Sequence, residues 1–179
     1  PFAAGSGTDA VARVVATRLG ERLKQPVIVD NKAGANAQIA ANHVAKAKPD
    51  GYTLFMTTNT SHSANPWLVK GLKYDPVKDF TPVARVGELP FALLVHPSVP
   101  AKTVQELIDY AKANPDRLSY GTPNSTSLVA SETFKYVTHA QITSVPYKSS
   151  PQALTDLMGN QIQVYVADLG SAWGTIKTD

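Results

Sequence analysis

The stretch that decides the fold is Leu118-Ser119-Tyr120-Gly121-Thr122-Pro123-Asn124-Ser125-Thr126-Ser127 with the run 128–137 after it. We expect a short strand over 118–120 that breaks at 121–123. Apolar residues then recur at three- and four-residue spacing, which predicts a helix starting near Ser125 to Ser127, because Pro123 cannot lie inside it. The first free N–H groups and three hydroxyls would suit a carboxylate or another anion. An ordinary capped helix explains the same pattern, and both interpretations stay open.

Strand and helix patterns alternate along the rest of the chain, which predicts an α/β protein with parallel sheets. We expect helices after Thr8 or Asp9, over 37–47 and over 103–113, and further strands over 27–29, 52–56, 83–86, 91–95, 142–147 and 162–168. Two prolines in 96–100 forbid regular structure there. We therefore predict two lobes, 1–95 and 96–179. In such folds ligands bind beyond the carboxyl ends of the strands, where 5–9, 57–63, 121–127, 147–150 and 168–171 would lie.

Composition excludes several classes of function. The chain has 179 residues, 43% hydrophobic and 17% charged, with a net charge of +3 and no cysteine. The basic residues form no stripe, so no nucleic-acid partner is expected. The four histidines lie far apart, without the spacing of metal ligands, and no G-x-S-x-G elbow occurs. We therefore expect no catalysis, no metal and no cofactor.

One enzymatic alternative has a motif. Gly5-Ser6-Gly7-Thr8-Asp9-Ala10 fits G-x-G-x-x-A, and Asp30 follows twenty residues after Ala10. This is the spacing of a dinucleotide fingerprint, so an NAD(P)-binding Rossmann oxidoreductase using Gly5, Gly7, Ala10 and Asp30 is the alternative. Against it, Asp9 would add negative charge where the pyrophosphate approaches.

Several stretches together resemble one family, the substrate-binding proteins of tripartite tricarboxylate transporters, or Bug family. The matching stretches are 1–9 (Pro-Phe-Ala-Ala-Gly-Ser-Gly-Thr-Asp), 29–35, 49–54, 74–80, 96–100, 145–148 and 152–159. The resemblance runs along the whole chain in the family's order. It implies a two-lobed periplasmic-binding-protein fold of the Venus-flytrap, type II-like kind with parallel or mixed sheets, here a fragment lacking the first strand and the C-terminal part.

The resemblance also implies a function. The chain would be a periplasmic receptor, with its signal peptide outside this chain, that captures a small carboxylate in a cleft between the lobes and delivers it to the membrane subunits of a transporter. The ligand-binding residues it implies are Gly5, Ser6, Gly7, Thr8, Asp9, Thr58, Asn59, Ser61, Thr122, Asn124, Ser125, Thr126, Ser127, Tyr147, Lys148 and Asp168.

Two departures from the family concern the ligand. The loop after Tyr120 lacks the family's Gly-x-Gly and its histidine, and Ser6 stands where the first loop has a second glycine. None of the presumed pocket loops contains arginine. We therefore expect the carboxylate to be held by N–H and hydroxyl donors, some through water, with Lys148 as the nearby cation.

Overall fold

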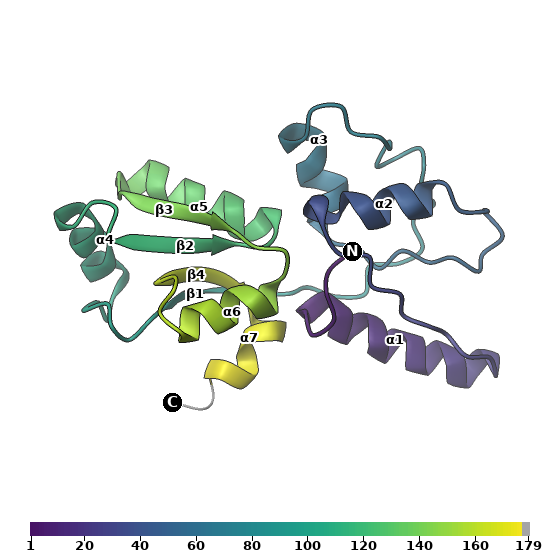
Figure 1. The fold of residues 1–179 in the computed structure, drawn as a ribbon. Helices are drawn as coiled ribbons and strands as arrows, with labels where there is room; N and C mark the ends of the chain where they lie inside the picture. The colour runs from purple at the N-terminus through teal and green to yellow at the C-terminus, as the bar shows by residue number, and fades with distance from the viewer. Residues whose placement is uncertain (177–179) are drawn as a thin grey trace. The chain divides into compact units, whose positions relative to one another are not determined.

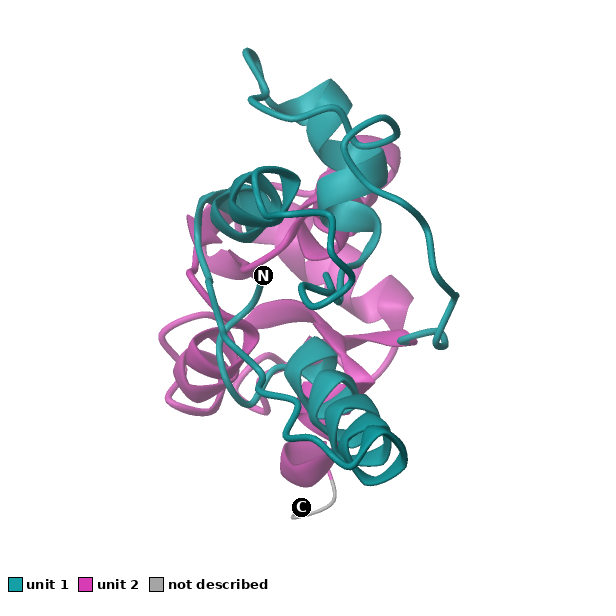
Figure 2. Ribbon diagram, turned by 90° about the vertical axis from the view of Figure 1, so that its right-hand side faces the viewer, with its two compact units in different colours: residues 1–89 teal, residues 90–179 magenta. Residues whose placement is uncertain are grey.

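The computed structural model describes residues 1–176 of the chain. They divide into two compact units, unit 1 over Pro1–Leu89 and unit 2 from Pro90 onward (Figure 2). Each unit is described by itself below. Among the described helices, none combines the length and the apolar character that crossing a membrane requires.

Unit 1 is built from helices and extended segments (Figure 1). Its elements are α1 (Gly7–Leu23), the short η1 (Ala35–Ala37), α2 (Gln38–Ala45), the π-helical turn η2 (Thr60–Ala64) and α3 (Asn65–Leu68). The cap of α1 is Ser6, whose hydroxyl accepts a hydrogen bond from the Asp9 N–H. The sequence placed this cap at Thr8 or Asp9, so the helix starts earlier than predicted.

The three strands predicted in this part of the chain do not form. Segments 27–29, 52–56 and 83–86 are extended but pair with no other strand within residues 1–176. The side chains of Ile28, Tyr52 and Val83 in these segments are exposed, with exposed fractions of 84%, 92% and 83%. An extended segment is a strand only when a neighbour completes its backbone hydrogen bonds, and no such neighbour is present among the described residues.

Unit 2 contains a four-stranded mixed sheet in the order β1-β4-β2-β3. The strands are β1 (Phe91–Val95), β2 (Leu118–Thr122), β3 (Ile142–Pro146) and β4 (Val164–Asp168). β2 runs parallel to both β3 and β4, whereas β1 is antiparallel to β4, with Phe91 opposite Asp168. The predicted α/β class with parallel or mixed sheets is therefore confirmed in this unit.

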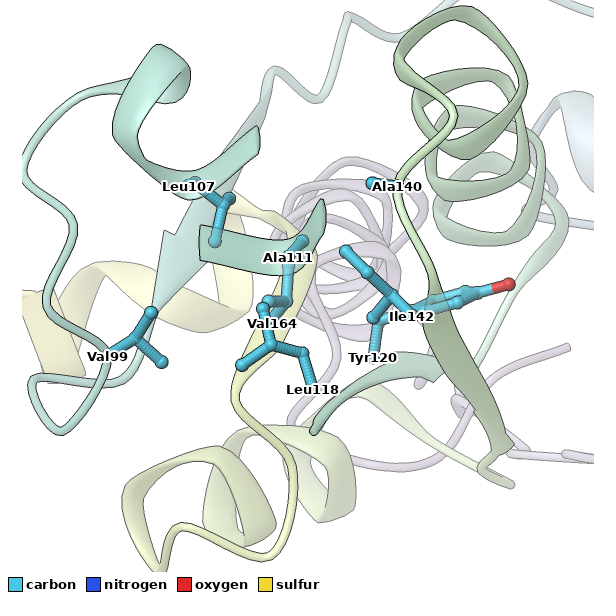
Figure 3. Packing of buried hydrophobic residues seen from close by; sticks show 8 residues of the cluster. All are labelled: Val99, Leu107, Ala111, Leu118, Tyr120, Ala140, Ile142 and Val164. Carbon is cyan, nitrogen blue, oxygen red and sulfur yellow. The ribbon is translucent and has the colours of Figure 1, made fainter. Parts of the chain in front are cut away.

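Alternating side chains of the strands supply two separate cores, because successive residues of a strand point to opposite faces. Figure 3 shows the first core, which contains Val99, Leu107, Ala111, Leu118, Tyr120, Ala140, Ile142 and Val164. The second core contains Ala153, Leu154, Leu157, Ile162, Tyr165, Ala167 and Ala172. The helices α4 (Val104–Ala113) and α5 (Ser125–Thr138) therefore pack with the first core, and α6 (Ser150–Met158) and α7 (Leu169–Ile176) with the second.

The boundary between the units differs from the predicted one. The sequence assigned 91–95 to the first lobe, because the prolines of 96–100 marked the break. In the structure this stretch is β1, whose pairing with β4 places it in the sheet of unit 2, and the division falls at Leu89. The prolines sit in the connection from β1 to α4, where a break in regular structure is needed within one unit.

Candidate ligand-binding site

The carboxyl ends of three neighbouring strands meet at one edge of the unit 2 sheet, because β3, β2 and β4 are parallel. A helix begins shortly after each strand: α5 after β2, α6 after β3 and α7 after β4. The edge therefore gathers the predicted residues of this unit: Thr122, Asn124, Ser125, Thr126, Ser127, Tyr147, Lys148 and Asp168. Helix starts carry N–H groups without intrahelical partners and the positive end of the helix dipole, so the edge favours anions.

Near the start of α5, the hydroxyls of Thr122 and Ser127 are used within the protein. The Asn124 side chain caps the helix by accepting from the Ser127 N–H at 2.9 Å. The Ser127 hydroxyl donates to the Val166 carbonyl at 2.7 Å, and the Thr122 hydroxyl donates to the Val145 carbonyl at 3.3 Å. A hydroxyl has a single proton, so neither can donate to a ligand while these bonds persist. The predicted helix start is confirmed, and the capped-helix interpretation accounts for these side chains.

Tyr147 and Lys148 follow β3 at the same edge. The Tyr147 hydroxyl donates to the Asp156 carboxylate at 2.8 Å. Burial, together with that hydrogen bond and the charge of Asp156, raises the pKa of Tyr147 to about 12, so its hydroxyl stays protonated. Lys148 is exposed. Its ammonium group therefore stands in water, where a cation attracts an anion weakly.

The three helix starts differ in how they are capped. Asp168 caps α7, since its carboxylate accepts from the Ser171 N–H at 2.9 Å and from the Ser171 hydroxyl at 2.8 Å. Asn124 caps α5. The start of α6 has no such cap, because the side chain of its N-cap residue, Ser149, accepts no hydrogen bond from the helix. The first turn of α6 is therefore the place at this edge where N–H groups lack a side-chain cap.

The first predicted loop of unit 1, Gly5, Ser6, Gly7, Thr8 and Asp9, already holds an anion of its own. The buried Asp9 carboxylate accepts from the Gly5 N–H at 3.0 Å, the Arg13 guanidinium at 2.9 Å and the Asn31 amide at 2.9 Å. Burial alone would raise the pKa of Asp9, but these three hydrogen bonds and the charge of Arg13 lower it to about 2. The N–H groups that the sequence offered to a ligand at Gly5 and Asp9 are thus satisfied by Asp9 and Ser6.

The second predicted loop of unit 1, with Thr58, Asn59 and Ser61, lies in a different network. The Ser61 hydroxyl contacts the Thr57 hydroxyl and the His62 ring at Nδ1, the latter at 2.9 Å. The Thr58 hydroxyl accepts from the Thr60 N–H at 3.3 Å. Phe55 and Phe80 flank the His62 ring, and burial lowers the pKa of His62. This loop therefore lies against an aromatic cluster through His62.

Comparison with known proteins decides the family. The model of the tripartite tricarboxylate transporter family receptor matches residues 11–178. The chain belongs to this family. Among curated relatives, it is 40% identical over 169 residues to a UPF0065 protein of Bordetella bronchiseptica, covering 93% of this chain and 50% of that one. It is 33% identical over 181 residues to protein BugT of Bordetella pertussis, covering 99% of this chain and 56% of that one. The chain thus spans about half the length of these relatives.

Solved structures of the receptor family share the fold. R. palustris Rpa4515 with adipate has 37% identity and a TM-score of 0.96, covering 99% of this chain and 60% of that one. MatC from Rhodopseudomonas palustris with bound malate has 32% identity and a TM-score of 0.91, covering 99% of this chain and 61% of that one. The predicted periplasmic-binding-protein fold, represented here by a part of it, is confirmed. The cleft between the lobes stays a prediction.

Family membership and geometry both disfavour the dinucleotide alternative. Asp30, the expected ribose ligand, is exposed and forms an ion pair with Lys32 at 2.8 Å. The segment 27–29 before it is not a paired strand. The Gly5 N–H, which a pyrophosphate would need as a donor, already donates to the Asp9 carboxylate. The glycine loop instead leads into α1, which Ser6 caps.

The described residues also bear on metal binding and on one buried tyrosine. Among residues 1–176 no group of His, Cys, Asp and Glu side chains is placed to hold a metal ion. Tyr165, in the middle of β4, was not singled out, although its buried hydroxyl lacks a hydrogen-bond partner among the described residues. Tyr165 lies in the predicted strand 162–168, and no pattern in the sequence shows whether a tyrosine there only fills the core or also contacts a site.

Proposed function

We propose that this chain is part of an extracytoplasmic receptor that captures a small carboxylate in the periplasm and delivers it to the membrane subunits of a transporter. The observation that carries the proposal is the edge of the unit 2 sheet, where three helix starts gather and that of α6 has no side-chain cap. Such a start attracts an anion through its N–H groups and its dipole.

The relatives support the chemical class of the ligand. The family is that of tripartite tricarboxylate transporter receptors, and two similar solved structures contain adipate and malate. Adipate and malate are both dicarboxylates, so we expect this receptor to prefer a small dicarboxylate over a neutral solute. The donors are N–H groups and hydroxyls, each contributing on the order of 1.5–3 kcal/mol when the acceptor is charged.

Calorimetry on purified full-length protein tests the proposal. Adipate, malate and benzoate are titrated beside their methyl esters, which keep the shape of the acid but lose its charge. At least one free acid should bind and its ester should not, because the donors are then left without a charged acceptor. The proposal is overturned if no free acid binds, or if an ester binds as tightly as its acid. Conversion of a bound acid into a product would contradict the expectation that the protein is not an enzyme.

A further inference from the structure

The Tyr165 hydroxyl is buried, and no side chain or backbone group within residues 1–176 forms a hydrogen bond with it. Tyr165 lies on β4 and is fully buried in the second core of unit 2. Within residues 1–176, two other buried side-chain atoms lack a hydrogen-bond partner: the Asn42 Oδ1 and the Ser131 Oγ. A buried donor without an acceptor destabilises the folded protein, so it calls for a physical reason.

Tyr165 packs with Ala153 and Leu154 of α6 in the second core. In the β2–β4 pair Tyr165 is opposite Gly121, and a Cβ at Gly121 would meet Ala153 of α6 at 3.3 Å. Burial is the largest influence on the pKa of Tyr165 and, with a smaller contribution from the charge of Asp168, raises it to about 12, although the nearby Ser150 and Ser127 hydroxyls lower it. Tyr165 therefore keeps its proton at neutral pH and is a potential donor.

Of these two serines, Ser150 is the one available to a ligand. The Ser127 hydroxyl already donates to the Val166 carbonyl. Ser150 is the first residue of α6, and Pro151 next to it has no N–H. The N–H groups of Ser150 and Gln152 therefore remain at a helix start that Ser149 does not cap. The nine-residue helix is long enough to present a dipole to an anion.

We propose that the start of α6 binds one carboxylate of the ligand and that Tyr165 positions Ser150 for this contact. The Tyr165 hydroxyl donates to the Ser150 oxygen, and the Ser150 hydroxyl donates onward to the carboxylate. The N–H groups of Ser150 and Gln152 supply further donors. The inference rests on the proposed function, because it names the group that receives the carboxylate of that receptor's ligand.

A chain of donors of this kind is directional. Because the Tyr165 proton points to Ser150, the Ser150 proton is left to point away from Tyr165 and toward the ligand. Each bond polarises the next, so the hydroxyl of Ser150 is a stronger donor with Tyr165 behind it than alone. A ligand that carries a carboxylate is thus selected over its neutral isostere.

A double-mutant cycle on full-length protein tests the inference. The variants are Tyr165→Phe, Ser150→Ala and the double variant that carries both substitutions. The probe is the acid among adipate, malate and benzoate that binds the wild type most tightly. Tyr165→Phe should weaken binding about tenfold and Ser150→Ala about ten- to a hundredfold, since each removes a bond in a chain that ends on a charge. The pair should bind no more weakly than Ser150→Ala alone, because Tyr165 acts through Ser150.

Melting of the ligand-free protein separates this role from a structural one. Tyr165→Phe removes an unsatisfied donor, so its melting temperature should equal or exceed that of the wild type. The control is Tyr120→Phe on β2, whose hydroxyl donates to Glu132; it should lower the melting temperature and leave affinity unchanged.

Each other result counts against the inference. The inference is overturned if Tyr165→Phe binds as tightly as the wild type, if the losses of the two single variants add in the double variant, or if Tyr165→Phe melts at a lower temperature without ligand. In each of these cases, binding of an acid by the wild type leaves the proposed function standing. If the wild type binds none of the three acids, the proposed function and the inference fall together.

Discussion

The backbone N–H of Gly5 donates to the Asp9 carboxylate at 3.0 Å, so the glycine loop at the start of α1 closes on a side chain of its own helix. Arg13 and Asn31 complete the coordination of this carboxylate. The same loop carries the motif that suggested a dinucleotide site. An internal carboxylate thus takes the position that an external anion would otherwise have, and it ties the N-terminal segment to α1.

The first prediction concerns acid stability. The pKa of Asp9 is about 2 in the folded protein, below its ordinary value of 3.8. A lowered pKa stabilises the fold fully above pH 3.8, and this contribution of about 2 kcal/mol is lost as the pH falls from about 4 to 2. Urea unfolding of Asp9→Asn should therefore show lower stability than wild type at pH 7 and a difference that shrinks at pH 2. Asp30→Asn, at an exposed ion pair, is the control and should change little. A constant deficit from pH 7 to pH 2 would contradict the assignment.

The second prediction concerns Gly121 on β2. A Cβ there would lie 2.8 Å from the Ile162 Cδ1 and 3.3 Å from the Ala153 Cβ. Gly121→Ala should therefore lower the free energy of unfolding by about 1–3 kcal/mol through overpacking. The matched control is Gly174→Ala in α7, where a Cβ meets nothing within 4 Å. It should be neutral or stabilising by up to about 1 kcal/mol, since alanine is the better helix former. Chemical denaturation of both variants compares them directly, and equal effects would refute the steric account.

The third prediction concerns Ser127. Its hydroxyl donates to the Val166 carbonyl inside unit 2, so Ser127→Ala should cost about 1–2 kcal/mol of stability. Thr17→Ala is the control, because the Thr17 hydroxyl donates to a carbonyl on an exposed helix face and its loss should cost less than about 0.5 kcal/mol. Thermal melting measures both. If Ser127→Ala is as stable as the wild type but no longer binds a carboxylate, the Ser127 hydroxyl contacts the ligand and has no structural role.

The fourth prediction concerns Lys148. This side chain is exposed, so its charge is well hydrated. Lys148→Met should weaken the binding of a free acid by no more than about fivefold, in line with the 0–1 kcal/mol of exposed ion pairs. Titration calorimetry at two salt concentrations measures the loss. Complete loss of binding in this variant would mean that a salt bridge holds the anion and that the helix starts play a minor part.

Much of unit 2 could be predicted because its signals are local. The helix predicted over 103–113 is present as α4, whose start carries a capping box formed by Thr103 and Glu106. Strand 91–95 has the predicted bounds, and α5 begins at Ser125. These features depend on neighbours a few residues away, such as Pro123 before α5. The predicted strands of unit 1 depend instead on partners elsewhere, and local pattern cannot supply a partner.

The site was predicted less well than the fold, for two physical reasons. First, a hydroxyl or N–H that looks free in the sequence can be satisfied internally, as Ser127 is by Val166 and Gly5 by Asp9. Second, the helix start that lacks a side-chain cap, at Ser150, follows Ser149, a residue of the type that usually caps helices. The sequence placed 147–150 at a strand end, but the cap that fails to form and the donor beneath it at Tyr165 are properties of three-dimensional packing.

The antiparallel pairing of β1 with β4 also shapes how this unit reaches its native state. β1 is made first among the four strands, yet its partner is the last, and the pairing joins Phe91 to Asp168 across the whole α/β sequence between them. The β2–β3 pair closes a much shorter loop, so it can form early, whereas β1 must stay unpaired until β4 has docked. During synthesis the β2–β3 pair can therefore form first, whereas β1 stays unpaired until β4 has left the ribosome.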